Sequence, residues 1–435
     1  MFKALILAIF LIGLSFAQDY MTAEDAIRIG LKNNFDIQIA RNDVKIAENN
    51  IGKGTAGFLP TLDLTGNYQK SRTDQDTNSP FSFGSTTSDN LGGRVTLNWT
   101  LFDGFGMFVN NDQYKQLAVL GEYQSRDIIE TTVVAILSAF FNLVQQEQLL
   151  DVAISAKEIS KTRLDKEKVK QDLGSASSTD YWNAQVSYNN DNATLINQEL
   201  RRLIAQNDLN VLLGRDADTP IQVAKKILIP DLAYNYEEIL ELAKKQNSRL
   251  IVAKQSKKVA DNNVSLSSVY FYPRLSFIAN YGYDERSVNS DSPRFEDPVE
   301  TISRDGIVGL NLTFNIFNGF RDKIDRQNAR LEAQNQEYVL QDQENKIASA
   351  VREKLETFYK RMELIDLEEQ NVIAAEKNLQ LNQDRYNIGA ASSLEFRDAQ
   401  VNLIRSQSTL IVARFQARIT RLEIEQLMGN WEIPQ

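Results

Sequence analysis

The chain has 435 residues, a formal net charge of −10 and a pI near 4.9, which argue against a general nucleic-acid binder because that class needs a basic face. Its mean hydropathy is −0.36, and beyond the N-terminus no run of about 18 consecutive apolar residues occurs, so the sequence excludes a helical membrane protein. A β-barrel stays open, since alternating strands barely raise hydropathy. The chain has no Cys and no His, so it has no disulfides, His-dependent catalysis or His-ligated metal, and we expect no cofactor.

The first residues are typical of a secretory signal peptide. Lys3 supplies a positive start, residues 5–16 form an apolar core, and Ser15-Phe16-Ala17 is a small-x-small cleavage site. We therefore expect a signal peptide over residues 1–17, removed before Gln18. No Cys follows the apolar core, so the sequence does not predict a lipoprotein.

Two distant stretches of the chain carry the same pattern. Residues 97–105 read LNWTLFDGF, and residues 312–320 read LTFNIFNGF. Further matches keep a nearly constant offset along the chain, for example Pro60 with Pro273 and Gly174 with Gly389. Shared helical periodicity is the alternative explanation, but it would not match Pro, Gly and an Ala-Gln-Val triplet in order. The sequence therefore predicts an internal two-fold repeat.

The repeat predicts the domain organisation. We expect a signal peptide (1–17), a first structural repeat (18–214), an equatorial linker (215–234), a second repeat (235–429) and a C-terminal tail (430–435). Each repeat begins with a helical run, predicted over 22–57 and 235–270. Pro60 and Pro273 then end the run and open a strand, because proline cannot continue a helix.

Each repeat next carries two predicted strands in which apolar and polar residues alternate, so that one face is apolar and the other polar. Strands of about ten residues with an aromatic residue near one end are typical of outer-membrane barrels. The apolar positions are Leu62, Leu64 and Tyr68; Val95, Leu97, Trp99 and Leu101; Leu275, Phe277, Ala279, Tyr281 and Tyr283; and Val308, Leu310, Leu312, Phe314 and Ile316. Trp99 and Phe314 match each other and are the predicted aromatic girdle, with ordinary sheet packing as the alternative.

The two predicted hairpin loops, 71–91 and 285–304, are polar. Asp74-x-Asp76-x-Asn78 is similar to the start of an EF-hand, but Ser79 stands at the glycine position and Ser85 at the bidentate glutamate position, which argues against calcium. After each second strand, Asp103-Gly104 and Asn318-Gly319 are predicted turns.

A helix of unusual length follows each second strand, predicted over 112–170 and 323–386. Neither contains Pro, and apolar residues recur every three or four positions. At about 1.5 Å per residue such a helix spans about 90 Å, a length that implies coiled-coil packing. We expect tip turns at Gly174 and Gly389, followed by a returning helix in each repeat.

Together these features resemble the TolC family of outer-membrane efflux proteins. The matching residues are the FLP and FYP strand entries at 58–60 and 271–273, the TLFDGF and NIFNGF strand exits, and RYNIGAASSLEFRDAQ at 385–400, which is similar to the family's tip signature. The resemblance covers essentially the whole mature chain. It implies an α+β membrane protein, a homotrimer whose 12-stranded β-barrel has four strands per chain and continues as a long α-helical coiled-coil tunnel in the periplasm.

Strand arithmetic agrees with a trimer. Four strands cannot close a barrel, and about eight make one that their own side chains fill, whereas twelve can enclose an aqueous pore. The polar strand faces would then line water, and the apolar faces would meet outer-membrane lipid.

The second tip carries the candidate gate. By the resemblance, Glu395 and Asp398 match the family's pore-closing acidic residues, and their spacing of three places both on one helix face. Three chains would bring six carboxylates toward one axis, where like charges raise each other's pKa and attract cations. The alternative for Glu395 is a capping box with Ser392, which does not explain Asp398.

The first tip is less acidic than the second. Asp180 repeats the capping position of Glu395, but neutral Asn183 matches Asp398. Ala391 stands where the family can carry a basic latch residue. The resemblance suggests that Tyr386 hydrogen-bonds Asp180 of a neighbouring tip, with plain packing as the alternative.

These features favour a passive export duct in the outer membrane of a Gram-negative-type bacterium, extending into the periplasm. The duct would serve a tripartite efflux pump or a type I secretion system, with a periplasmic adaptor and an inner-membrane transporter as partners. The alternative is a secreted coiled-coil structural or adhesive protein without a pore. An enzyme is not predicted, because no Ser-His, Cys-His or metal-ligand constellation exists.

Overall fold

The computed structural model describes residues 20–75, 85–173, 178–291 and 297–429. The predicted signal peptide, Gly174 and the C-terminal tail lie outside these residues. The chain forms two compact units, each taken by itself below. The helical unit comprises Met1–Arg41, Gln124–Leu250 and Glu344–Gln435, and the strand unit comprises Asn42–Tyr123 and Ile251–Gln343.

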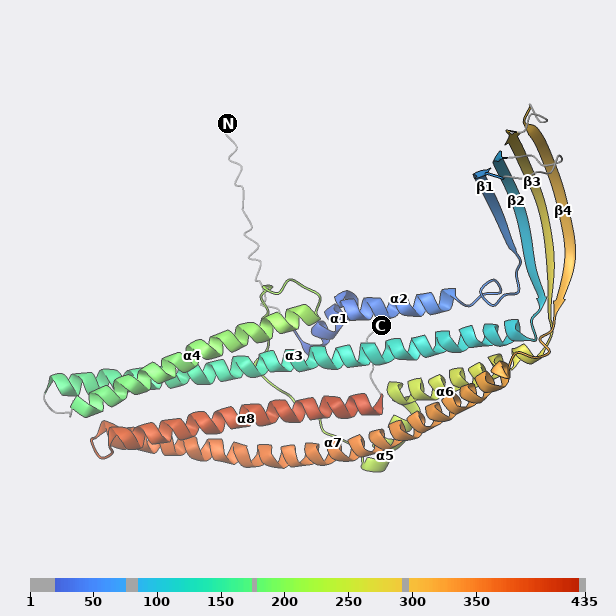
Figure 1. The fold of residues 1–435 in the computed structure, drawn as a ribbon. Helices are drawn as coiled ribbons and strands as arrows, with labels where there is room; N and C mark the ends of the chain where they lie inside the picture. The colour runs from blue at the N-terminus through green and yellow to red at the C-terminus, as the bar shows by residue number, and fades with distance from the viewer. Residues whose placement is uncertain (1–19, 76–84, 174–177, 292–296, 430–435) are drawn as a thin grey trace, which may run out of the picture. The chain divides into compact units, whose positions relative to one another are not determined.

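Both halves of the chain follow the same order of elements: two short helices, two strands, one very long helix and a returning helix (Figure 1). The elements are α1 (Ala23–Asn33), α2 (Phe35–Asn49), β1 (Thr61–Thr73), β2 (Thr86–Phe102), α3 (Gly106–Asp172), α4 (Ser178–Leu212), α5 (Tyr236–Gln246), α6 (Ser248–Leu266), the 3-10 turn η1 (Val269–Phe271), β3 (Arg274–Ser290), β4 (Val299–Thr313), α7 (Arg321–Asn387) and α8 (Ser393–Met428). The long helices α3 and α7 each have 67 residues, so each is about 100 Å long.

The single helical runs predicted over 22–57 and 235–270 are wrong, because each is broken by an asparagine. Asn34 has an extended backbone, and its side chain accepts from the Ile37 amide at 3.2 Å and donates to the Leu212 carbonyl at 2.9 Å. Asn247 repeats this arrangement in the second half, with Leu250 at 3.1 Å and Leu427 at 3.2 Å. One side chain thus starts the second short helix and binds the end of the returning helix, and we call each arrangement an asparagine clasp.

The first helical run also ends earlier than predicted. α2 stops at Asn49, and residues 50–60 form irregular turns before β1. Gly52, Gly54 and Gly57 fall in this stretch, and Gly57 has a φ of +92°, a backbone conformation that a helix does not use.

The four strands form one antiparallel sheet in the order β1-β2-β3-β4 (Figure 1). The register determines which side chains share a face of the sheet, because directly paired residues point to the same side. Leu62, Leu97, Ala279 and Val308 form one row on the apolar face. On the polar face, Thr65 pairs with Arg94, Arg94 with Gly282, and Gly282 with Asp305.

β4 ends earlier than predicted, although it begins at Val299, within the predicted loop 285–304. It ends at Thr313, so Phe314 and Ile316 lie beyond the strand. Thr313 pairs with Arg274, the first residue of β3, and the preceding Pro273 has no N–H with which to extend the ladder. Phe314 therefore stands at the foot of the sheet with 55% of its surface exposed.

Both strand-to-helix turns place two consecutive residues in the left-handed region. Gly104 and Phe105 have φ values of 74° and 71°, and Gly319 and Phe320 have 71° and 63°. A left-handed backbone costs a non-glycine residue about 1–2 kcal/mol. Aromatic contacts offset part of this cost. Phe105 packs edge-on against Phe102 and Tyr272, and Phe320 packs edge-on against Phe317.

The long helix α3 contains an apolar segment that forms part of the core of the helical unit. Among the described residues, α3 alone contains a window long and apolar enough to cross a membrane, judged by length and composition only. Its side chains instead fill the core of this unit, together with α1, α2, α4, the 215–234 linker and α8. The buried members are Ala26, Leu31, Ile37, Val133, Ile136, Leu137, Phe140, Phe141, Leu143, Val144, Ala205, Leu209, Leu213, Ile221, Val223, Ile227 and Leu422.

The close approach of the end of α4 to the end of α1, beside the first clasp, leads to a stability prediction. Gly214 follows α4 with a φ of +63°, and a Cβ there would lie 2.6 Å from the Asn33 carbonyl oxygen, so Gly214→Ala combines strain with a clash. We expect a loss of at least about 1 kcal/mol, visible as a lower apparent Tm by circular dichroism in detergent. Gly54→Ala is the control, because a Cβ there meets only Leu59, at 3.7 Å. Equal melting of the two variants would contradict the close approach of Gly214 to the end of α1.

Candidate functional site: the tip of the helical unit

Glu395 lies in the first turn of α8 and takes part in the capping box. Its carboxylate accepts from the Ser392 amide at 2.7 Å, and its own amide donates to the Ser392 hydroxyl at 3.1 Å. These hydrogen bonds hold the pKa of Glu395 below its ordinary value of 4.5. A depressed folded-state pKa means that the cap contributes stability above the ordinary pKa and loses it as the pH falls through the folded one.

The other predicted gate carboxylates are differently placed. Asp398 is exposed one turn further along α8, on the same face as Glu395, and it makes no hydrogen bond to a described residue. Asp180 lies in the first turn of α4 and is partly exposed. Gly389 ends the α7 side of the second tip with a φ of 77°. Asp398 thus has no capping task to explain it.

Tyr386, near the end of α7, is buried with a partner that the sequence did not predict. Its hydroxyl donates to the carboxylate of Glu167 on α3 of the same chain, whereas the family resemblance suggests Asp180 of a neighbouring tip. Its ring stacks on Phe396 with centroids 5.2 Å apart and planes 4° apart. Burial, then the bond to Glu167, raises the pKa of Tyr386 well above its ordinary value, so the hydroxyl stays protonated and keeps donating.

Glu167 is the functional residue that sequence reasoning missed. It is only 2% exposed, yet its carboxylate also lies 3.2 Å from the Lys170 ammonium. The available signal was the run Arg163, Glu167, Lys170, which a helix places on one face at spacings of four and three. Helical spacing alone does not show that this face is buried, because the burial comes from the packing of the second helical hairpin.

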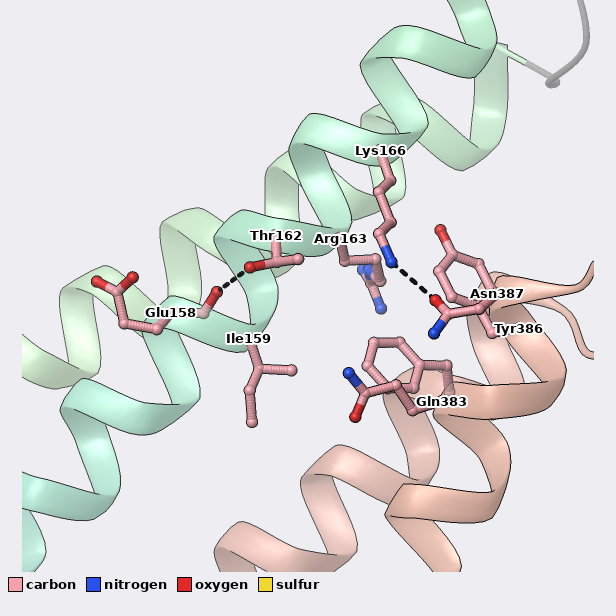
Figure 2. Close-up of a pocket in the computed structure, with 9 residues that line it drawn as sticks. Glu158, Ile159, Thr162, Arg163, Lys166, Gln383, Tyr386 and Asn387 are labelled. Carbon is pink, nitrogen blue, oxygen red and sulfur yellow. Dashed lines mark hydrogen bonds between the residues drawn. The ribbon is translucent and has the colours of Figure 1, made fainter.

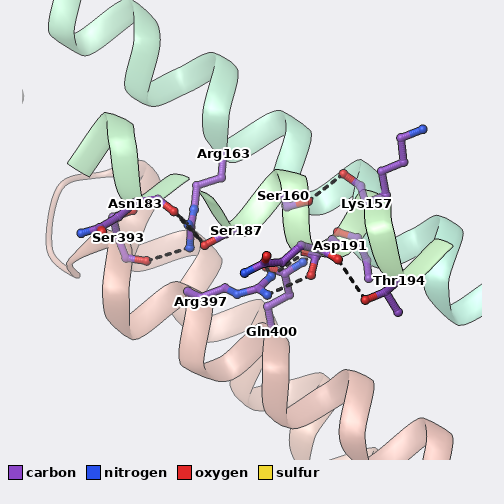
Figure 3. Close-up of polar contacts among 12 residues, drawn as sticks. Lys157, Ser160, Arg163, Asn183, Ser187, Asp191, Thr194, Ser393, Arg397 and Gln400 are labelled. Atoms are coloured by element: carbon purple, nitrogen blue, oxygen red, sulfur yellow. Dashed lines mark hydrogen bonds and ion pairs between the residues drawn. The ribbon is translucent and has the colours of Figure 1, made fainter. Parts of the chain in front are cut away.

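A second link joins the two hairpins about one turn into α8 and more than three turns into α4. The Arg397 guanidinium on α8 holds Asp191 on α4 through two hydrogen bonds, of 2.6 and 2.9 Å (Figure 3). Arg397 also donates to the amide oxygen of Gln400 at 3.1 Å, and the fully buried Gln400 donates to the Ala156 carbonyl at 2.9 Å. A bidentate arginine–carboxylate pair of this kind fixes geometry as well as charge.

Arg163 supplies a third link, from α3. Its guanidinium donates to the Ser187 hydroxyl at 2.8 Å and, at 3.4 Å, to the carbonyls of Asn183 and Ser393 (Figure 3). The side chain is almost entirely buried, and this burial together with the nearby Arg397 charge lowers its pKa. Three contacts thus join the α3/α4 hairpin to the α7/α8 hairpin, and we call them the tip links. They are Tyr386–Glu167, Arg397–Asp191 and Arg163–Ser393.

The predicted residues of the strand unit lie at the ends of its strands. Pro60 and Pro273 each directly precede a strand, β1 and β3 respectively. The Trp99 indole N–H donates to the Phe58 carbonyl at 3.0 Å, and 41% of its surface is exposed. Trp99 therefore has its polar atom satisfied and its ring partly open, which suits a girdle residue.

Comparisons with known proteins agree with this architecture. The family model described as outer membrane efflux protein matches residues 26–215 and 239–430, one segment in each half. TolC of Vibrio cholerae is 21% identical over 86% of this chain and 83% of its own, and TolC of Escherichia coli K12 is 20% identical over 96% and 83%.

Solved structures share the fold. The CmeC outer membrane channel of Campylobacter jejuni superposes with a TM-score of 0.78 at 15% identity, covering 94% of this chain and 85% of CmeC. The open state of the MtrE outer membrane channel of Neisseria gonorrhoeae superposes with a TM-score of 0.70 at 18% identity. The match covers 94% of this chain and 88% of MtrE. Since the family model covers most of both halves, the alternative of a pore-free adhesive protein falls away. The chain belongs to the outer membrane efflux protein family and is a TolC-like efflux channel of the outer membrane that extends into the periplasm, not an enzyme.

Proposed function

We propose that this channel is the passive exit duct of a tripartite efflux pump or a type I secretion system. A periplasmic adaptor and an inner-membrane transporter would load the cargo, and the channel would supply the path and the gate. The observation that carries the proposal is the tip, where three polar links tie two helical hairpins that must separate to open a passage.

Channels of the TolC family are trimers, and three copies of this sheet would supply twelve strands. The polar face of each sheet, with Thr65, Arg94 and Asp305, would then line the water-filled lumen. The apolar face is suited to lipid, because Leu64 and Val308 are 80% and 75% exposed in the single chain.

The proposed gate has two parts. Glu395 and Asp398 of three chains would form an acidic ring at the constriction, since both are exposed on one face at the start of α8. The tip links would hold that face in place, because Phe396 and Arg397, which lie between the two carboxylates in sequence, anchor α8 to Tyr386 and Asp191. The exposed residues would thus select ions, and the buried ones would keep the gate closed.

The tip also exposes large apolar side chains. Leu173 is 76% exposed and Trp182 60% in the first hairpin, and Ile388 is 80% exposed and Leu394 68% in the second. Apolar side chains gathered at one end of a helical unit are typical of a protein contact site. We assign this surface to the adaptor, whose binding would compete with the packing that supports the tip links.

The acidic ring is tested by a charge-removing variant. Glu395→Gln with Asp398→Asn should raise conductance in planar bilayers and weaken block by divalent cations at least about tenfold, because up to six charges leave the constriction. Glu395→Gln alone preserves the capping box, since glutamine also reaches the N-cap amide. Unchanged block in the double variant would eliminate the ring and leave the channel assignment intact.

The tip links are tested by removing one hydroxyl. Tyr386→Phe takes the hydroxyl donor from the buried Glu167 carboxylate, a loss of about 1.5–3 kcal/mol for a hydrogen bond to a charged group. We expect amide exchange of residues 384–400 to rise about tenfold or more by mass spectrometry, with more frequent channel openings. Tyr359→Phe is the matched control on the same helix, since Tyr359 is 48% exposed. Equal exchange in both variants would refute the link.

The docking surface is tested by photo-crosslinking in cells. A benzoylphenylalanine at Trp182 should crosslink to a periplasmic adaptor protein, identified by mass spectrometry. The same probe at Val211, which is 65% exposed at the other end of α4, is the control. The assignment fails if Val211 gives the same product or if Trp182 gives none.

A further inference from the structure

Near the tip, α3, α7 and α8 line a pocket in two parts that borders the tip links and lies apart from the acidic residues Glu395 and Asp398. The inner part has a volume of about 170 Å³ and the outer part about 550 Å³. Thr162, Lys166, Tyr386 and Asn387 line both parts, so the outer part is an entrance to the inner one. An inner volume of this size is enough for one aromatic ring, since a cavity of about 150 Å³ accommodates benzene.

The inner pocket has an apolar wall. Ile159 of α3 and Phe396 of α8 line it together with the ring of Tyr386, and Figure 2 shows Ile159 facing the α7/α8 side across the opening. Phe396 and Tyr386 are 4% and 5% exposed and stacked on each other, so this wall is rigid. A flat apolar group can therefore lie against it without displacing charged side chains.

Two cations border the same space. Arg163 is 3% exposed, and its Nε–H finds no acceptor among the described residues, although its other nitrogens are bonded. The Lys166 ammonium reaches across the opening to the Asn387 amide oxygen, 2.7 Å away (Figure 2). A neutral amide is a weak partner for an ammonium group, and a carboxylate would be a stronger one.

The acidic groups nearby are turned away or already paired. Figure 2 shows the Glu158 carboxylate pointing away from Lys166, at the far end of the pocket. Glu167 is held by Tyr386 and Lys170. Asp165 lines only the outer part. The inner pocket thus combines an apolar wall with a positive edge.

We propose that this pocket is a binding site for small planar organic carboxylates, with the ring between Ile159 and Phe396 and the carboxylate between Lys166 and Arg163. Lys166 would exchange its bond to Asn387 for one to the ligand, and the buried guanidinium would add a fixed positive charge. The ligand would contact α3 of the first hairpin and α7 and α8 of the second. The site stands independently of the acidic ring and of any partner protein.

The probe is 4-fluorobenzoate, followed by fluorine NMR during titration with the full mature channel in detergent. We expect saturable binding of 4-fluorobenzoate and none of 4-fluorobenzamide, which has the same shape without the charge. Lys166→Gln should weaken the carboxylate at least about tenfold, because the lysine supplies the exposed charge-assisted contact. Thr162→Trp should abolish binding, because it fills both parts of the pocket without changing charge.

Lys161→Gln is the matched control, since Lys161 is also exposed on α3 but lies outside the pocket lining. It should bind 4-fluorobenzoate as the unaltered channel does. The proposal is overturned if the carboxylate and the amide bind equally, if neither shows saturable binding, or if Lys166→Gln and Lys161→Gln behave alike. Each result is read from binding alone, so it is separate from the conductance tests of the gate.

Discussion

The open edges of a four-stranded sheet constrain the rest of this molecule. β1 and β4 stand at the two edges, and the sheet exposes apolar side chains such as Leu64 and Leu312. In lipid, each unpaired backbone group costs several kcal/mol, so edges of this kind must meet strands of other copies. The trimer of the family satisfies this requirement. Threefold assembly in turn would bring the two acidic residues of each chain together in the proposed ring of six.

The tip is built from a different kind of contact than the core that supports it. The core is apolar, from Val133 to Leu422, whereas the tip links bury carboxylates, guanidinium groups and a phenol. Buried ion pairs add little net stability because desolvation offsets their attraction, but breaking one side of a pair is costly. Such links fix the geometry of the tip, and in the proposed gate that geometry is the closed one. A partner that supplied substitute hydrogen bonds could release them without melting the core.

The sequence predicted the parts of the fold that depend on local patterns. The four strands, the two long helices and the glycine turns follow from alternation, the absence of proline and the positions of Gly104 and Gly319. It did not predict the helix breaks at Asn34 and Asn247, because each asparagine acts through the end of a helix about 180 residues away. The burial of Glu167 was not predicted for the same reason, because it depends on Tyr386, which lies 219 positions further along the chain.

The asparagine clasps bear on the ancestry of the channel. Asn34 binds Leu212, and Asn247 binds Leu427, so each clasp joins two helices of the same half. A half-length chain would therefore carry its own caps and long helix, together with two strands. Six such chains would supply the same twelve strands that three full chains supply now. The two halves of the present chain differ at their tips, since the second carries Asp398 where the first carries the neutral Asn183.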